Sequence, residues 1–127
     1  MMRAIKSKDT KPELAVRRVL HAMGYRFRLH TEDLPGRPDI VFRARKKAIF
    51  VHGCFWHRHP GCRYSTMPKT RTSFWEKKFE ANVTRDRRVI ESLVAEGWRV
   101  LVVWECQVRN EMDTLPATLV SFMENTF

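Results

Sequence analysis

The chain has 127 residues, of which 43% are hydrophobic and 30% are charged. Its length suits a single domain over residues 1–127, and its composition is too apolar for a disordered chain. The 24 Lys and Arg residues against 14 Asp and Glu residues give a net charge of +10, which favours a polyanionic partner such as nucleic acid. No apolar run is long enough for a signal peptide or a membrane span, so we expect a cytoplasmic protein with no membrane partner.

The first element expected is a helix. Thr10 can cap its start, and Glu13, three residues later, can close a capping box. Apolar residues at helical spacing continue to Met23, and Gly24 predicts the end of the helix. Residues 25–29 then alternate between polar and apolar side chains, as a half-buried strand does.

Residues 39–42 and 48–52 are two short β-rich runs joined by a polar stretch, which is typical of a hairpin. If the turn centres on Arg45 and Lys46, Asp39 faces His52 across the pair. Residues 53–72 are rich in Gly, Pro, His and Cys and show no periodicity. Such a long segment in a compact domain needs something that ties it down.

A helical period returns over residues 73–96, followed by a buried strand over residues 99–104 and a short helix over residues 115–123. The expected order is therefore αβββαβα. Because the last strand is reached through a long helix, this order predicts an α/β fold with a mixed sheet flanked by helices.

All three cysteines of the chain belong to one candidate metal site. Cys54, Cys62 and Cys106 with one imidazole suit a tetrahedral zinc ion, and four protein ligands make such a site structural. Spacing alone leaves His52, His57 and His59 as competing nitrogen ligands. Buried cysteines without a metal are the alternative.

Asp39 is the candidate carboxylate for a second metal. The hairpin brings it beside Val51 and His52, and a carboxylate with a backbone carbonyl and phosphate oxygens suits magnesium. Each candidate also has a plain structural role: Asp39 can close a turn, Glu13 can cap a helix and His57 can support the zinc loop.

Residues 55–75 mix aromatic and basic side chains, a combination that stacks on bases and neutralises phosphates. The alternative is that the rings pack under the loop, which we expect for Phe74. The aromatic and basic residues are Phe55, Trp56, Arg58, Arg63, Tyr64, Lys69, Arg71, Phe74 and Trp75. A polar helix face with Asn82 and Asp86 follows, and it is also consistent with a solvated surface.

Six blocks of the chain resemble the very short patch repair (Vsr) endonucleases. They are MRAI at residues 2–5, LPGRPD at 34–39, HGCFWH at 52–57, TRTSFW at 70–75, NVTRDR at 82–87 and GWRVLVVWEC at 97–106. Together they span nearly the whole chain. The GCFWH block followed by the distant WEC block is highly specific, so the chain is identified as a member of this family.

The resemblance implies a restriction-endonuclease-like fold, a structural zinc and a catalytic magnesium. It also implies a nick 5′ to the thymine of a T:G mismatch, which deamination of 5-methylcytosine creates. The implied partners are double-stranded DNA, a cytosine-5 DNA methyltransferase and the repair polymerase and ligase that act afterwards. The enzyme would work as a monomer at the nucleoid. Relatives usually carry an arm before the Met2 block, and its contribution to DNA affinity would be missing here.

The resemblance further assigns roles to individual residues. In the active site, Asp39 and the main-chain oxygen of Val51 would bind magnesium. His57 would be the general base, with Glu13 and His52 in support. The zinc ligands would be Cys54, His59, Cys62 and Cys106. The wedge beside the mismatch would be formed by Phe55, Trp56 and Trp75 from the major groove and by Met2 from the minor groove. Further DNA contacts are expected from Arg58, Lys69, Arg71, Asn82 and Asp86.

Two other functions are compatible with parts of this pattern. A zinc-dependent DNA-binding module without catalysis would need the cysteines, the aromatic rings and the charge, but not Asp39. A restriction-type nuclease would share the active site but cut matched DNA as a dimer. Magnesium dependence tests the first, and a comparison of matched with T:G duplexes tests the second.

Overall fold

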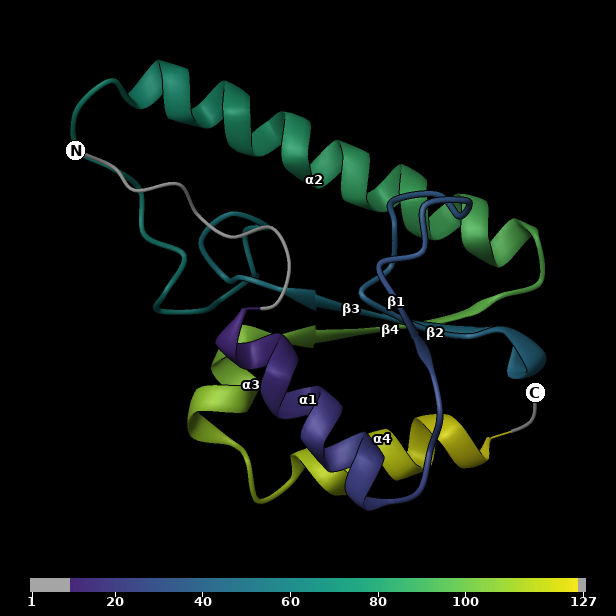
Figure 1. The fold of residues 1–127 in the computed structure, drawn as a ribbon. Helices are drawn as coiled ribbons and strands as arrows, with labels where there is room; N and C mark the ends of the chain where they lie inside the picture. The colour runs from purple at the N-terminus through teal and green to yellow at the C-terminus, as the bar shows by residue number, and fades with distance from the viewer. Residues whose placement is uncertain (1–9, 126–127) are drawn as a thin grey trace.

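The computed structural model describes residues 10–125, which are built around one four-stranded sheet (Figure 1). The strands follow one another across the sheet in chain order: β1 (Arg28–Leu29), β2 (Ile40–Phe42), β3 (Lys47–His52) and β4 (Arg99–Trp104). Strand β2 is antiparallel to both of its neighbours, β1 and β3, whereas β3 and β4 are parallel. A parallel pair needs a crossover connection, which the long helix between β3 and β4 provides.

Helices cover both faces of the sheet. They are α1 (Lys11–Ala22), α2 (Thr72–Ala95), α3 (Glu105–Asn110) and α4 (Leu115–Glu124). In Figure 1, α2 lies on one side of the sheet and the other three helices lie on the opposite side. This arrangement confirms the predicted α/β fold with a mixed sheet. Within the described part of the chain, no helix has the length and hydropathy needed to cross a lipid bilayer.

Two apolar layers result from the alternation of side chains along the central strands. The layer toward α1 and α4 contains Val16, Leu20, Ile40, Phe42, Ile49, Val103, Leu115, Leu119 and Met123. The layer toward α2 contains Val41, Ala48, Phe50, Leu93 and Trp98. Because helices cover both faces, β2 and most of β3 are buried on both sides, which explains their nearly continuous apolar sequence.

The hairpin between β2 and β3 is shifted from the expected register. Ile40 pairs with Ile49 and Phe42 with Lys47, so Phe50, and not His52, stands opposite Asp39. The expected pairing of Asp39 with His52 is therefore wrong by two residues. The reason lies in the turn, which is a 3-10 turn over Arg43–Arg45 that ends in a left-handed residue, Lys46 with φ 54°.

Other elements also differ in extent from the expectation. The strand expected over residues 25–29 is reduced to Arg28–Leu29, and both residues are exposed. Strand β4 is only half-buried apart from Val103. Helix α3 was not expected at all. It begins directly after β4, where the Gln107 side chain accepts a hydrogen bond of 2.7 Å from the backbone N–H of Trp104.

Lys47, the first residue of β3, connects the sheet to the end of α4. Its side chain is a buried cation, since the residue is only 4% exposed. The Nζ atom donates hydrogen bonds to the backbone oxygens of Phe122, Met123 and Asn125, at 2.8, 2.6 and 2.7 Å. Carbonyls at a helix C-terminus lack partners within the helix, and this ammonium group supplies one.

Replacing Lys47 with Met should lower the free energy of unfolding by about 2 kcal/mol, because buried carbonyls lose a charged donor. Chemical denaturation measures this difference. Lys46→Met is the control, since Lys46 is exposed and donates a hydrogen bond to one carbonyl, that of Glu96, among the described residues. Equal effects of the two substitutions would contradict a stabilising role for the buried lysine.

Candidate functional site

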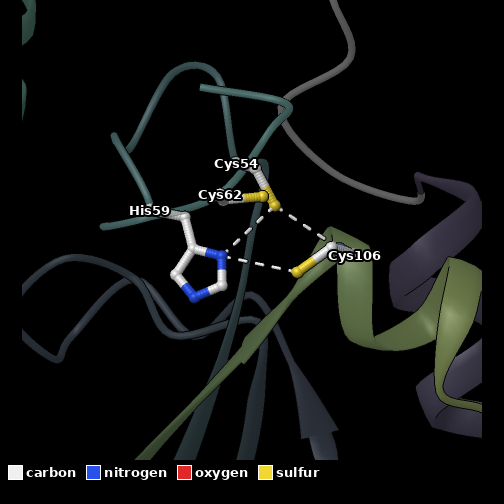
Figure 2. Close-up of side chains that lie close together, drawn as sticks. All are labelled: Cys54, His59, Cys62 and Cys106. Atoms are coloured by element: carbon white, nitrogen blue, oxygen red, sulfur yellow. Dashed lines mark hydrogen bonds between the residues drawn. The ribbon is translucent and has the colours of Figure 1, made fainter. Parts of the chain in front are cut away.

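Three cysteines and one histidine converge beside the ends of β3 and β4. They are Cys54, His59, Cys62 and Cys106, and Figure 2 shows their side chains pointing toward one another. Their ligand atoms all lie within 4.8 Å of one another. The His59 Nδ1 atom lies 3.4 Å from the Cys106 sulfur and 3.7 Å from the Cys54 sulfur. Three sulfurs and one imidazole nitrogen in such a cluster fit a four-coordinate metal ion.

The geometry selects one histidine among the three that compete on spacing. The His59 ring points its Nδ1 atom at the thiols and stacks on Trp104, with centroids 4.2 Å apart. His52 and His57 stack on each other instead, with centroids 3.8 Å apart and an angle of 6° between the rings. These two histidines share a different cluster, with Asp86.

Arg58 holds the loop between β3 and α2 from inside. Its guanidinium group donates hydrogen bonds of 3.0 Å to the carbonyls of Phe55, Ser65 and Thr66. The same group lies 3.9 Å from the centre of the Phe79 ring. These contacts give Arg58 a structural role within the loop, and its expected contact with DNA phosphate stays a prediction.

A cavity of about 560 Å³ lies between α2 and the β2–β3 hairpin. Polar side chains from several elements that are far apart in the sequence line this cavity. Its lining includes His30, Arg37, Asp39, Val51, His52, His57, Arg85 and Asp86. Most of the residues predicted for the active site thus line this one cavity.

Asp39 is the carboxylate best placed to bind a cation in this cavity. Its Oδ2 atom accepts a hydrogen bond of 2.7 Å from the backbone N–H of Val51. Its Oδ1 atom lies 4.0 Å from His30 Nε2, beyond hydrogen-bond distance, and so remains available. Burial raises the pKa of Asp39 to about 6, the Val51 N–H opposes this shift, and the Glu13 carboxylate adds to it. A bound cation would stabilise the buried, charged Asp39 carboxylate, so the residues present fit a divalent cation.

Glu13 reaches the same region from α1. Thr10 Oγ1 accepts a hydrogen bond of 3.4 Å from the Glu13 N–H, as the predicted cap requires. The Glu13 carboxylate contacts Arg17 and lies 2.6 Å from His30 Nε2. Glu13, His30 and Asp39 form one of the clusters whose ligand atoms lie within 4.8 Å. His30 was not among the residues predicted from the sequence, although this residue directly follows the strand expected over residues 25–29.

His57 and Asp86 form the second polar pair of the cavity. The His57 Nδ1 atom lies 2.6 Å from Asp86 Oδ2. Such a carboxylate fixes the orientation of an imidazole and leaves Nε2 for other chemistry. Burial lowers the pKa of His52 to about 4, and His57 acts in the same direction. His52 is therefore neutral at neutral pH, which allows the two rings to stack.

The aromatic residues of the loop meet those of α2. The Trp56 ring centre lies 5.1 Å from Phe55 and 5.7 Å from Trp75, and all three rings pack around the buried Phe79. Phe55, Trp56 and Trp75 themselves remain half-buried. The expectation that Phe74 packs under the loop is wrong, because it is 45% exposed and lies 4.4 Å from the Arg71 guanidinium.

The residues predicted to contact DNA occupy different settings. Lys69 and Arg71 are exposed, as phosphate contacts require. Asn82 donates a hydrogen bond of 3.2 Å to the backbone oxygen of Trp56, so it positions the loop. Asp86 faces His57 inside the cavity. Met2 lies outside the described residues.

The sequence of the chain is similar to those of known DNA endonucleases. The family described as DNA mismatch endonuclease Vsr matches residues 1–63 of the chain. The DNA mismatch endonuclease Vsr of Escherichia coli (strain K12) is 45% identical over 123 residues, which cover 97% of this chain and 78% of that protein. The chain belongs to the Vsr family. The type II nicking enzyme V.XorIIP of Xanthomonas oryzae pv. oryzae is 52% identical over 124 residues, 98% of this chain and 90% of that protein.

Among solved structures, the catalytic domain of the homing endonuclease I-Bth0305I has a similar fold. The TM-score is 0.62, with 22% sequence identity, and the match covers 90% of this chain and 94% of that domain. At this identity the likeness shows the fold alone. Membership of the Vsr family makes the chain a DNA endonuclease of the mismatch-repair type, which confirms the predicted enzyme class. It argues against a DNA-binding module without catalysis.

The cysteine cluster leads to a test of its role. Cys106→Ala should lower the melting temperature by about 5 °C or more, because part of the energy of metal binding is folding energy. Ser92→Ala, at an exposed position of α2, is the control. Mass spectrometry of the native protein should find one tightly bound metal ion per chain. Native protein that is folded but free of metal would contradict this assignment.

Proposed function

We propose that this Vsr-family endonuclease nicks DNA on the 5′ side of the thymine in a T:G mismatch and so initiates very short patch repair. The observation that carries the proposal is the meeting of Asp39 with the His57–Asp86 pair at one cavity, beside the aromatic cluster of Phe55, Trp56 and Trp75. The first set of groups suits hydrolysis, and the second suits the recognition of a weakly stacked base pair.

The two clusters would hold different metals. Asp39 and the main-chain oxygen of Val51 would bind Mg²⁺, with Glu13 nearby, because oxygen ligands suit this ion. A bound Mg²⁺ supplies charge neutralisation at the phosphate that is attacked. The cluster of Cys54, His59, Cys62 and Cys106 would hold Zn²⁺ in a structural role, since its four ligands leave no position open for a substrate.

The protein groups would handle the proton of the attacking water. With Nδ1 held by Asp86, the Nε2 atom of His57 would accept this proton as a general base. His52 supports the base, because it is neutral and stacks on His57 without adding a positive charge. The proposed site uses side chains of one chain only, and we propose that the enzyme acts as a monomer.

Recognition of the mismatch would rest on the deformability of DNA. Inserting apolar rings between base pairs costs a few kcal/mol of stacking, and this cost is lowest where the pairing is already imperfect. The half-buried rings of Phe55, Trp56 and Trp75 would form the wedge on one side, with Met2 on the other. Lys69 and Arg71 would contact phosphates, which gives affinity without sequence preference.

This activity has a defined chemical setting. T:G mismatches arise when 5-methylcytosine is deaminated, so the enzyme would be linked to a cytosine-5 DNA methyltransferase. A nick alone is no repair, so a polymerase and a ligase must follow. We place this work on chromosomal DNA in the cytoplasm, at the nucleoid.

Asp39→Ala should reduce nicking of a T:G duplex to the level seen in excess chelator, because it removes the cation ligand. Binding of the same duplex should remain, because the aromatic cluster and the basic surface are unchanged. Asp33→Ala is the matched control, since Asp33 is exposed and pairs with Arg43. Nicks are mapped on duplexes that carry T:G, each other mismatch or no mismatch. Equal cleavage of matched duplex would indicate a restriction-type nuclease instead.

Trp56→Ala should lower the preference for T:G over matched duplex by about tenfold, since stacking of an aromatic ring on a base is worth roughly 1 to 3 kcal/mol. Its salt dependence should stay the same, because no phosphate contact is lost. Lys69→Ala, the charge control, should weaken binding to both duplexes and reduce the salt dependence. Affinities at several salt concentrations measure both effects. An unchanged preference for Trp56→Ala would show that this ring only packs within the loop.

A further inference from the structure

His30 lies where strand β1 ends beside the start of β2. Leu29 pairs with Ile40, so the next pair of residues is His30 and Asp39. The backbone N–H of His30 donates a hydrogen bond of 3.2 Å to the carbonyl oxygen of Asp39. The backbone of His30 is left-handed, with φ 46°, which few residues other than glycine adopt. A strained residue at this point places an imidazole next to the cation-binding carboxylate.

The imidazole of His30 stands between two carboxylates from different elements. Its Nε2 atom lies 2.6 Å from Glu13 Oε2 on α1 and 4.0 Å from Asp39 Oδ1 at the start of β2. Its side chain is 20% exposed, and the residue lines the cavity. His30 therefore links α1 to the cavity. Its Nε2 atom is too far from Asp39 Oδ1 to form a hydrogen bond with it.

The position of His30 matters because the two side chains beside it, Glu13 and Asp39, carry like charges. Glu13 and Asp39 are both acidic and share a poorly hydrated space, so each disfavours the charge of the other. His30 stands between the two carboxylates, 2.6 Å from Glu13 and 4.0 Å from Asp39, so its hydrogen bond to Glu13 fixes where that carboxylate lies relative to Asp39. Arg17 contacts Glu13 from the same helix, so Glu13 also has a permanent cation beside it.

We propose that His30 is a positioning residue that sets the affinity of the Asp39 site for a divalent cation, by holding Glu13 through Nε2 at a fixed place beside Asp39. This inference rests on the proposed function, in which Asp39 binds Mg²⁺. Mg²⁺ requires a nearly ideal octahedral arrangement of ligands, so it is sensitive to how its carboxylates are oriented. Partners that orient metal ligands typically change metal affinity by 10-fold to 100-fold when they are removed.

Two amide substitutions separate the hydrogen bond from the presence of a ring. The amide nitrogen of Gln in His30→Gln can take the place of Nε2 and donate to Glu13. The shorter side chain of Asn in His30→Asn places its amide near the position of Nδ1 and does not reach Glu13. A ring needed only for packing between α1 and β1 would not distinguish these two substitutions.

The experiment uses the zinc-loaded protein without DNA and Mn²⁺ as the probe, with free Mn²⁺ followed by electron paramagnetic resonance. We expect the Kd for Mn²⁺ to rise about tenfold or more in His30→Ala and His30→Asn, and to return close to the native value in His30→Gln. His21→Ala is the control, because this exposed histidine lies in the last turn of α1. Melting temperatures verify that each variant is folded.

Nicking supplies the second readout. In His30→Ala the Mg²⁺ concentration for half-maximal nicking should rise, while the rate at saturating Mg²⁺ should recover. An unchanged Kd for Mn²⁺, or a His30→Gln variant as weak as His30→Asn, would overturn the proposal. Failure of the proposed function looks different: Asp39→Ala would then bind Mn²⁺ as the native protein does, or nicking would continue in excess chelator.

Discussion

The attachment of the loop that follows β3 is the constraint on which the rest of the site depends. Residues 53–71 contain no helix or strand, yet they carry His57 and two rings of the aromatic cluster, Phe55 and Trp56. The cluster of Cys54, His59, Cys62 and Cys106 joins this loop to α3 at the end of β4, and Arg58 fills the loop from within. A metal ion bound by this cluster would cross-link segments that are distant in sequence, and so would limit the conformations that the loop can adopt.

Helix α2 contacts both the aromatic cluster and His57 along one of its faces. Trp75 and Phe79 pack against the loop rings, Asn82 binds the Trp56 carbonyl and Asp86 holds His57. Their spacing of three and four residues places them on the same face of the helix. Further along this face, Leu93 belongs to the apolar layer under the sheet. One rigid helix therefore sets the position of the aromatic cluster, the proposed wedge, relative to His57, the proposed general base.

Helical periodicity predicted α1 and α2, and short apolar runs predicted the positions of β3 and β4, although β4 is less buried than expected. The register of the hairpin was missed, since it depends on the left-handed Lys46 and no Gly or Asn marks that position. The pairing of His57 with Asp86 and the contacts of His30 with Glu13 and Asp39 arise from tertiary packing between segments that are distant in sequence. Spacing could not choose His59 over His57 for the same reason.

Anomalous diffraction at the zinc absorption edge would locate the metal ion that we propose as the anchor of the loop. We expect a single strong peak between Cys54, Cys62, Cys106 and His59, about 2.3 Å from each sulfur and about 2.0 Å from His59 Nδ1. A peak bound to His57 instead, or a disulfide between two of these cysteines in a folded and active enzyme, would contradict it.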